Sequence, residues 1–87
     1  MRELEKQYKA LANRRRLQIL KYLQQCHQAS VTDIAHHLKL TMKATSKHLS
    51  QLLGVEAVER DYQGLYMIYR LGNPLKPTIK HALELVK

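Results

Sequence analysis

The spacing of apolar residues predicts five helices, because Leu, Ile, Val and Tyr recur every three or four positions along most of the chain. The predicted helices cover residues 2–12, 14–25, 31–38, 42–53 and from about 74 or 75 to 86. In the first, Leu4, Tyr8 and Leu11 fall on one face. In the last, the stripe consists of Leu75, Ile79, Leu83 and Val86. The segment QCHQAS between the second and third helices is a polar connector.

Polar residues mark where these helices begin. Asn13 precedes the second helix, Ser30 or Thr32 caps the third, and Thr41 precedes the fourth. Their side-chain oxygens accept hydrogen bonds from the first free backbone N–H groups of a helix. Asp33 lies in the first turn of the third helix, where a carboxylate suits the positive helix end.

After Gly54 the pattern changes from helical to extended. Residues 57–71, AVERDYQGLYMIYRL, contain two runs of strand-favouring residues around Tyr62-Gln63-Gly64. The central glycine accepts positive φ, so these runs predict a β-hairpin. The expected order is therefore four helices, a hairpin and a last helix: a mainly α fold with a small β-hairpin.

Length and composition limit the possibilities. The 87 residues suffice for one domain, and 45% of them are hydrophobic, although Phe and Trp are absent. Such a small core gains stability from the apolar surface of a second subunit. No apolar run reaches the ~20 residues that span a bilayer, and the N-terminus MRELEKQYKA lacks the features of a secretion signal. A single cysteine, Cys26, excludes an internal disulfide, so we expect a cytoplasmic protein.

The charge is strongly basic and unevenly distributed. Fifteen Lys and Arg against seven Asp and Glu give a net charge of +8, which indicates a polyanionic partner such as nucleic acid, an anionic membrane face or an acidic protein. No helix combines a basic face with large aromatics, which disfavours the membrane. From Ile34 to Val55 there is no acidic residue, while three lysines and three histidines fall there.

Two short helices joined by a tight turn and followed at once by a hairpin describe a winged helix-turn-helix. The second helix of such a pair lies in the DNA major groove, where a carboxylate would face phosphates. Its buried side would be Thr45, Leu49 and Leu52, and its exposed side Thr41, Met42, Lys43, Ser46 and Lys47. The competing interpretation, an ordinary solvated face, fits less well because solvated faces normally mix charges of both signs.

Three segments resemble the ArsR-type family of winged helix-turn-helix repressors: KALANRRRLQILKYL, VTDIAHHLKLTMKATSKHLSQL and the YRL that closes the second wing strand. The resemblance implies a homodimer built from the first and last helices, with recognition helices in successive major grooves. It also implies that Arg16 contacts a phosphate. Lys39 and Glu56 stand where the family usually has glycine, and the wing tip lacks the usual Arg and Lys.

These considerations give two sets of candidate residues. The candidate DNA contacts are Arg14, Arg15, Arg16, Thr41, Met42, Lys43, Thr45, Ser46, Lys47, His48, Arg60 and Gln63. The candidate dimer interface consists of Leu4, Tyr8, Leu11, Leu75, Ile79, Leu83 and Val86. His48 either donates to a phosphate or packs against the third helix while forming a hydrogen bond to the turn, and the residues alone leave both open.

Sensor and catalytic chemistry are not expected. The thiolate motif of the family's metal sensors has no counterpart in ASVTDIA, and His81 with Glu84 is more typical of a solvent-exposed pair than of a metal site. Cys26 is either a small core side chain or a thiol that pairs across subunits or responds to oxidants. No catalytic constellation is present, so we predict no enzyme activity, metal or cofactor. The alternative functions are a protein-interaction module that uses Leu65-Tyr66-Met67 and a non-specific architectural DNA-binding module.

Overall fold

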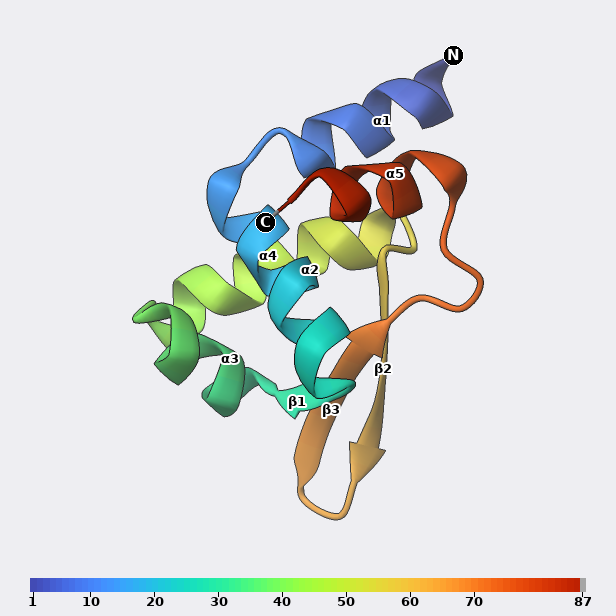
Figure 1. Cartoon of the computed structure of the whole chain (residues 1–87). Coiled ribbons are helices and arrows are strands. Elements are labelled where there is room, and N and C mark those ends of the chain that lie inside the picture. Colours follow the sequence, from blue (N-terminus) through green and yellow to red (C-terminus); the bar gives the residue numbers. More distant parts are fainter. Residues whose placement is uncertain (87) are drawn as a thin grey trace.

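The computed structural model describes residues 1–86. The elements are α1 (Arg2–Leu11), α2 (Arg14–Cys26), β1 (Ala29–Ser30), α3 (Val31–Leu38), α4 (Met42–Gly54), β2 (Val58–Gln63), β3 (Tyr66–Leu71) and α5 (Pro77–Leu85). The predicted order and the winged helix-turn-helix fold are confirmed, with the short strand β1 added. Figure 1 shows α1 and α5 together at one end of the molecule and the β2–β3 wing projecting at the other. None of the described helices is long and apolar enough to cross a membrane.

The turn between α3 and α4 is fixed by local hydrogen bonds. The Ser30 hydroxyl accepts from the Asp33 N–H at 3.1 Å, and the Thr41 hydroxyl accepts from the Ala44 N–H at 3.0 Å, so both predicted caps form. Lys39 ends α3 in the left-handed conformation, with φ 57° and ψ 44°. A non-glycine residue in that region costs roughly 1–2 kcal/mol. The backbone N–H groups of Lys39 and Leu40 return to α3 carbonyls, which offsets part of this cost.

The sheet has the order β1-β3-β2 and is antiparallel throughout. Gln63 pairs with Tyr66, so the hairpin loop is Gly64-Leu65, slightly later than the sequence pattern indicated. Gly64 has φ 65° and Leu65 does not share this conformation, which is the pattern of a type II′ turn. The two-residue strand β1 pairs Ala29 with Tyr69, within the segment that we had predicted to be a polar connector.

The core is centred on α2. Ile19, Leu20 and Leu23 are almost completely buried, and the inner faces of the other helices surround them. Ile79 and Leu83 of α5 are 0% and 2% exposed within the single chain. Our assignment of these two residues to the dimer interface was therefore wrong, because α5 turns its main apolar stripe toward its own core. The half-buried Leu75 precedes α5, which begins only at Pro77, and Val86 is the C-cap.

A tight connection joins the wing to α5. The Gly72 N–H donates to the Ala57 carbonyl at 2.9 Å, and a Cβ at this position would clash with the Glu56 carbonyl oxygen. Glu56, where the family usually has glycine, has φ 59°. The Lys76 ammonium then pairs with Glu3 at 2.7 Å and with Glu56 at 3.3 Å. These contacts set the position of α5 against α1 and the end of α4.

Candidate nucleic-acid interface

The outer face of α4 carries exposed polar, cationic and apolar side chains. The exposed residues on and before its first two turns are Thr41, Met42, Lys43, Ser46 and Lys47. Leu49 and Leu52 are fully buried on the opposite face and hold α4 against the core. The exposed face therefore stands outward as the pattern predicted.

Thr45 is a correction to our list of contact residues. It is 0% exposed, and its hydroxyl donates to the Thr41 carbonyl at 2.8 Å. This bond satisfies the buried hydroxyl within the helix, so the side chain belongs to the inner face and is not available to a partner.

Cations on α4 have no acidic neighbours. No carboxylate lies within ion-pair distance of Lys43 or Lys47 among residues 1–86. The first turn of α4 also contains no acidic residue. Both ammonium groups are exposed, so their charge is directed at whatever approaches this face.

The start of α2 adds further positive charge. Arg14 and Arg15 are exposed in its first turn, which contains no acidic residue, and Arg15 donates to Gln18 at 3.3 Å. Cations at a helix N-terminus are opposed by the helix dipole, at a cost of about 0.3–1 kcal/mol each. A polyanion bound here would offset this unfavourable interaction, because its negative charge would attract both guanidinium groups.

Arg16 points into the protein. Its Nε donates to the Ala10 carbonyl at 2.6 Å, and its Nη2 donates to the Lys9 carbonyl at 3.2 Å, which caps the last turn of α1. Its Nη1 lies 3.4 Å from Nδ1 of His48 on α4. Three of the five guanidinium N–H groups are thus used inside the chain, which does not match a role as a simple phosphate contact.

His48 is half-buried beside this guanidinium. Burial lowers the pKa of His48 below its ordinary value of 6.5, and the positive charges of Arg16, Lys47 and Arg15 lower it further. The imidazole is therefore neutral at pH 7. The hydrogen bond of the His48 ring joins Nδ1 to Arg16 on α2, and not to the turn that one of our two alternatives named.

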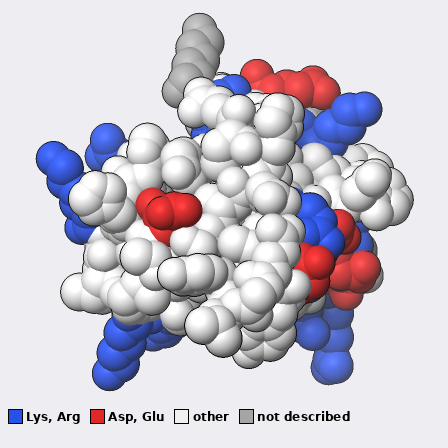
Figure 2. All heavy atoms as spheres, turned by 90° about the horizontal axis from the view of Figure 1, so that it is seen from below, with Lys and Arg blue, Asp and Glu red and all other residues white. Residues whose placement is uncertain are grey.

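The two arginines of the wing have partners within the wing, and one of them is neutralised by carboxylates. Arg70 forms ion pairs with Glu59 at 2.9 Å and Asp61 at 2.7 Å, which raise the pKa of its guanidinium. Arg60 donates to the Tyr69 hydroxyl at 3.1 Å. Figure 2, seen from below, shows Lys and Arg standing at separate edges around a largely uncharged centre, with acidic atoms close to some of them.

The wing tip itself is apolar. Tyr62, Leu65 and Tyr66 are 70%, 95% and 64% exposed. Gln63 donates to the Gln28 side chain at 3.4 Å. Both candidate contacts in the wing, Arg60 and Gln63, thus have hydrogen-bond partners within the chain. The wing tip therefore presents aromatic and aliphatic surface beside the exposed Arg60 and Gln63.

Exposed apolar side chains also gather on α1 and α5. Leu4, Tyr8 and Leu85 are 41%, 58% and 67% exposed. A groove of about 460 Å³ runs between α1, the start of α2 and α5 beside Tyr8 and Leu85. Leu85 was missing from our dimer list, because it falls outside the stripe of Leu75, Ile79, Leu83 and Val86. Leu11 lines the same groove, although it is largely buried in the chain's own core.

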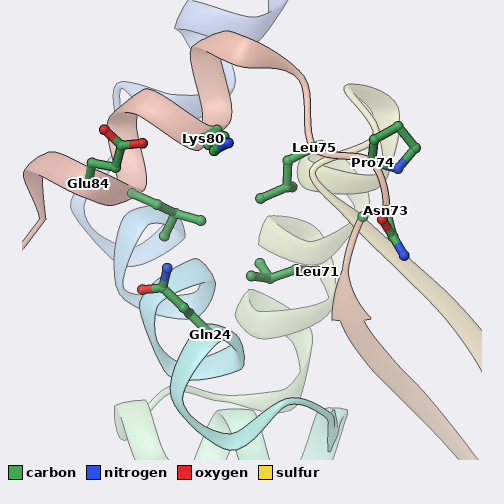
Figure 3. A pocket seen from close by; sticks show the side chains of 9 residues that line it. Gln24, Leu71, Asn73, Pro74, Leu75, Lys80 and Glu84 are labelled. Carbon is green, nitrogen blue, oxygen red and sulfur yellow. The ribbon is translucent and has the colours of Figure 1, made fainter.

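A second hollow, of about 590 Å³, lies between α2, the β3–α5 connection and α5. Figure 3 shows Leu71 and Leu75 within it and Lys80, Glu84 and Gln24 around it. Sequence reasoning did not find this cleft, because its wall is the irregular connection after β3.

Metal-ligating side chains do not converge in the described part of the chain. No group of three or more His, Cys, Asp or Glu residues is placed to hold a metal ion within residues 1–86. Glu84 lines the cleft of Figure 3, whereas His81 lines the groove beside Tyr8. Cys26 is a free, half-buried thiol at the end of α2, and its Sγ donates to the Gln28 carbonyl at 3.4 Å.

Comparisons with known proteins agree with this architecture. Residues 13–60 match the model of the arsR family of bacterial regulatory proteins. The arsenical resistance operon repressor of Bacillus subtilis (strain 168) is 30% identical over 73 residues, which are 84% of this chain and 70% of that protein. The transcriptional repressor PagR of Bacillus anthracis is 35% identical over 66 residues, which are 76% of this chain and 66% of PagR.

Among solved structures, Mb0332 from Mycobacterium bovis superposes with a TM-score of 0.80 and 30% identity, over 95% of this chain and 73% of that one. It is described as a homodimeric winged helix-turn-helix DNA-binding domain and a possible ArsR-family transcriptional regulator. The family match covers more than half of the 87 residues and includes α2 to the start of β2. The chain therefore belongs to the arsR family of bacterial regulatory proteins.

Proposed function

We propose that this chain is a homodimeric, sequence-specific DNA-binding transcription regulator that acts in the cytoplasm as a repressor, by occupying its site. The observation that carries the proposal is the outer face of α4, where Met42, Lys43, Ser46 and Lys47 are exposed and no carboxylate compensates the lysines. The membership of the arsR family and the repressors that the chain resembles support the same function.

In this proposal α4 enters the major groove. Met42 would contact a thymine methyl group, and Lys43 or Lys47 would reach O6 and N7 of guanine or a nearby phosphate. Arg14 and Arg15 would neutralise phosphates beside the groove, where the duplex charge offsets their unfavourable place at a helix N-terminus. The apolar wing tip contributes little charge, so Arg60 and Gln63 remain minor contacts.

Two copies would form the functional unit. Leu4, Tyr8 and Leu85 expose apolar surface on α1 and α5, at the end of the molecule opposite the wing. A second copy would remove this surface from water. The homodimeric state of Mb0332 supports this assembly. With two-fold symmetry the DNA site becomes an inverted repeat, with half-sites about one helical turn or a multiple apart.

The test is selection of bound duplexes from a random library, followed by affinity measurements over a range of salt concentrations. We expect an enriched inverted repeat whose binding falls steeply with salt. Salt-sensitive binding with no enriched sequence would replace the proposal with a non-specific architectural role. Light scattering at micromolar concentration tests the dimer, and a mass of only 10.2 kDa would contradict it.

A protein-interaction function is the second candidate, because Leu65 and its tyrosine neighbours are strongly exposed on the wing. Such a module would bind a protein through Leu65-Tyr66-Met67 and would show no affinity for selected duplexes. Leu65→Asp separates the two candidates. It leaves duplex binding intact under the main proposal, but abolishes partner binding under the second.

A further inference from the structure

Three helices meet at a single guanidinium group. Arg16 belongs to α2. Its Nε and Nη2 donate to the carbonyls of Ala10 and Lys9 at the end of α1. Its Nη1 lies 3.4 Å from Nδ1 of His48 on α4. Two hydrogen bonds to the same short stretch of backbone fix the plane of the guanidinium. The direction from which it approaches His48 is therefore fixed by α1 as well as by α2.

This contact determines which nitrogen of His48 carries hydrogen. An arginine side chain has N–H donors and no acceptor, and it stays protonated. The Nδ1 atom of His48 must therefore accept. A neutral imidazole that accepts through one nitrogen carries its hydrogen on the other, so His48 has its N–H on Nε2.

The Nε2–H group of His48 has no hydrogen-bond partner in the described part of the chain. The bond through Nδ1 is the only hydrogen bond of the His48 side chain within residues 1–86. No buried side-chain nitrogen or oxygen in this part of the chain lacks a partner. Nε2 is therefore accessible to solvent, on the same helix as Lys47 and close enough to Arg15 and Lys47 for their charges to affect its pKa.

We propose that Arg16 is a positioning residue that holds His48 with Nδ1 as acceptor, and that the Nε2–H of His48 donates to a phosphate oxygen of bound DNA. The phosphate contact rests on the DNA-binding function proposed above, whereas the Arg16–His48 arrangement belongs to the free protein. Arg16 then acts on the DNA only through His48, and not by the direct phosphate contact that the family resemblance implied.

A phosphate fits this donor better than a base edge does. Arg15 and Lys47 surround the imidazole with positive charge, and a hydrogen bond to an anionic oxygen is roughly twice as strong as one between neutral groups. In the proposed binding mode the N–H of this half-buried ring would reach the DNA backbone that borders the groove, whereas the exposed Lys43 and Ser46 would face the groove itself.

Two substitutions of His48 distinguish the role of the acceptor Nδ1 from that of the donor Nε2–H. In His48→Asn the side-chain oxygen takes the place of Nδ1 as an acceptor for Arg16, but the distant donor is lost. In His48→Gln the longer amide places an N–H near the position of Nε2, but the acceptor near Arg16 moves. The exposed Gln51 on the same helix supplies the control substitution Gln51→Ala.

We expect His48→Asn to bind the selected duplex roughly tenfold more weakly per subunit, the worth of a hydrogen bond to a charged group. His48→Gln should lose less than half of that factor, and Gln51→Ala should bind as the parent does. Thermal melting of each variant confirms that the fold is intact. Parental affinity for His48→Asn, or equal losses in both His48 variants, would refute the phosphate donor.

Arg16 is tested without DNA. In ring ¹⁵N spectra of the free parent protein at pH 8, His48 should show an unprotonated Nδ1 and a protonated Nε2. Arg16→Gln removes the charge, so the pKa of His48 should rise toward its ordinary value. A protonated Nδ1, or an unchanged titration in Arg16→Gln, would overturn the arrangement. If no duplex binds the parent protein, the proposed function fails while this test still decides the role of Arg16.

Discussion

Lys47→Glu is the sharpest perturbation of the proposed DNA surface. Lys47 is exposed on α4 and forms no ion pair or side-chain hydrogen bond among residues 1–86. Surface substitutions of this kind change stability by less than about 0.5 kcal/mol. Any large effect on DNA affinity would therefore come from the interface and not from unfolding.

The size of the effect follows from the charges. A lysine 4 Å from a phosphate in water is worth about 1 kcal/mol, and charge reversal turns this attraction into a similar repulsion. The change is then about 2 kcal/mol per subunit and twice that in a dimer, which weakens binding on the order of 10³-fold at low salt. Each lost phosphate contact also lowers the slope of log K against log salt by about 0.9.

Fluorescence anisotropy with the selected duplex, measured from 50 to 300 mM salt, gives both quantities. Lys80→Glu is the matched control, because Lys80 lies on α5 beside the cleft of Figure 3 and carries the same charge change. We expect the control to keep the parental slope. If Lys47→Glu binds with the parental affinity and slope at moderate salt, α4 does not face the duplex and the proposed interface is wrong.

The other predictions concern assembly, folding and pH. Tyr8→Glu should convert the proposed dimer to a monomer of 10.2 kDa in light scattering, because it places a charge in the apolar groove between α1 and α5. Gly72→Ala should lower the free energy of unfolding by about 1–3 kcal/mol in urea, because the added methyl meets the Glu56 carbonyl. The pKa of His48 is lowered on folding, so its contribution to stability is complete above pH 6.5 and is lost as the pH falls through the lower folded pKa. Urea unfolding from pH 8 to 5 should show this loss in the parent, and a smaller loss in His48→Gln.

The helix starts were predictable because their chemistry is local. Asn13, Ser30 and Thr41 each form the capping bond that their positions indicated. The start of α5 was not predictable in this way, because Leu75 fits the spacing of the helical stripe although it precedes the helix. Pro77 marks the true first turn, since proline lacks the N–H that the helix interior requires.

Periodicity shows which residues share a face but does not show what covers it. Ile79 and Leu83 form a clear stripe, but they pack into the chain's own core, so Leu85 is the exposed large apolar residue of α5. Thr45 lies on the inner face of α4, where its hydroxyl donates to the carbonyl of Thr41, one turn earlier in the chain. The direction of Arg16 depends on the end of α1, six residues away and across a turn, so no pattern within α2 could reveal it.

The placement of acidic residues explains why α4 carries more effective charge than the net value implies. Five of the seven carboxylates form ion pairs: Glu5 with Lys9, Glu3 and Glu56 with Lys76, and Glu59 and Asp61 with Arg70. These pairs lie on α1, in the wing, and where the start of α5 meets α1 and the connection after α4. Lys43, Lys47, Arg14 and Arg15 take part in none of them. In the proposed binding mode these four unpaired cations on α4 and the start of α2 would attract the duplex, while the wing, in which Glu59 and Asp61 balance Arg60 and Arg70, would present an almost neutral, aromatic surface.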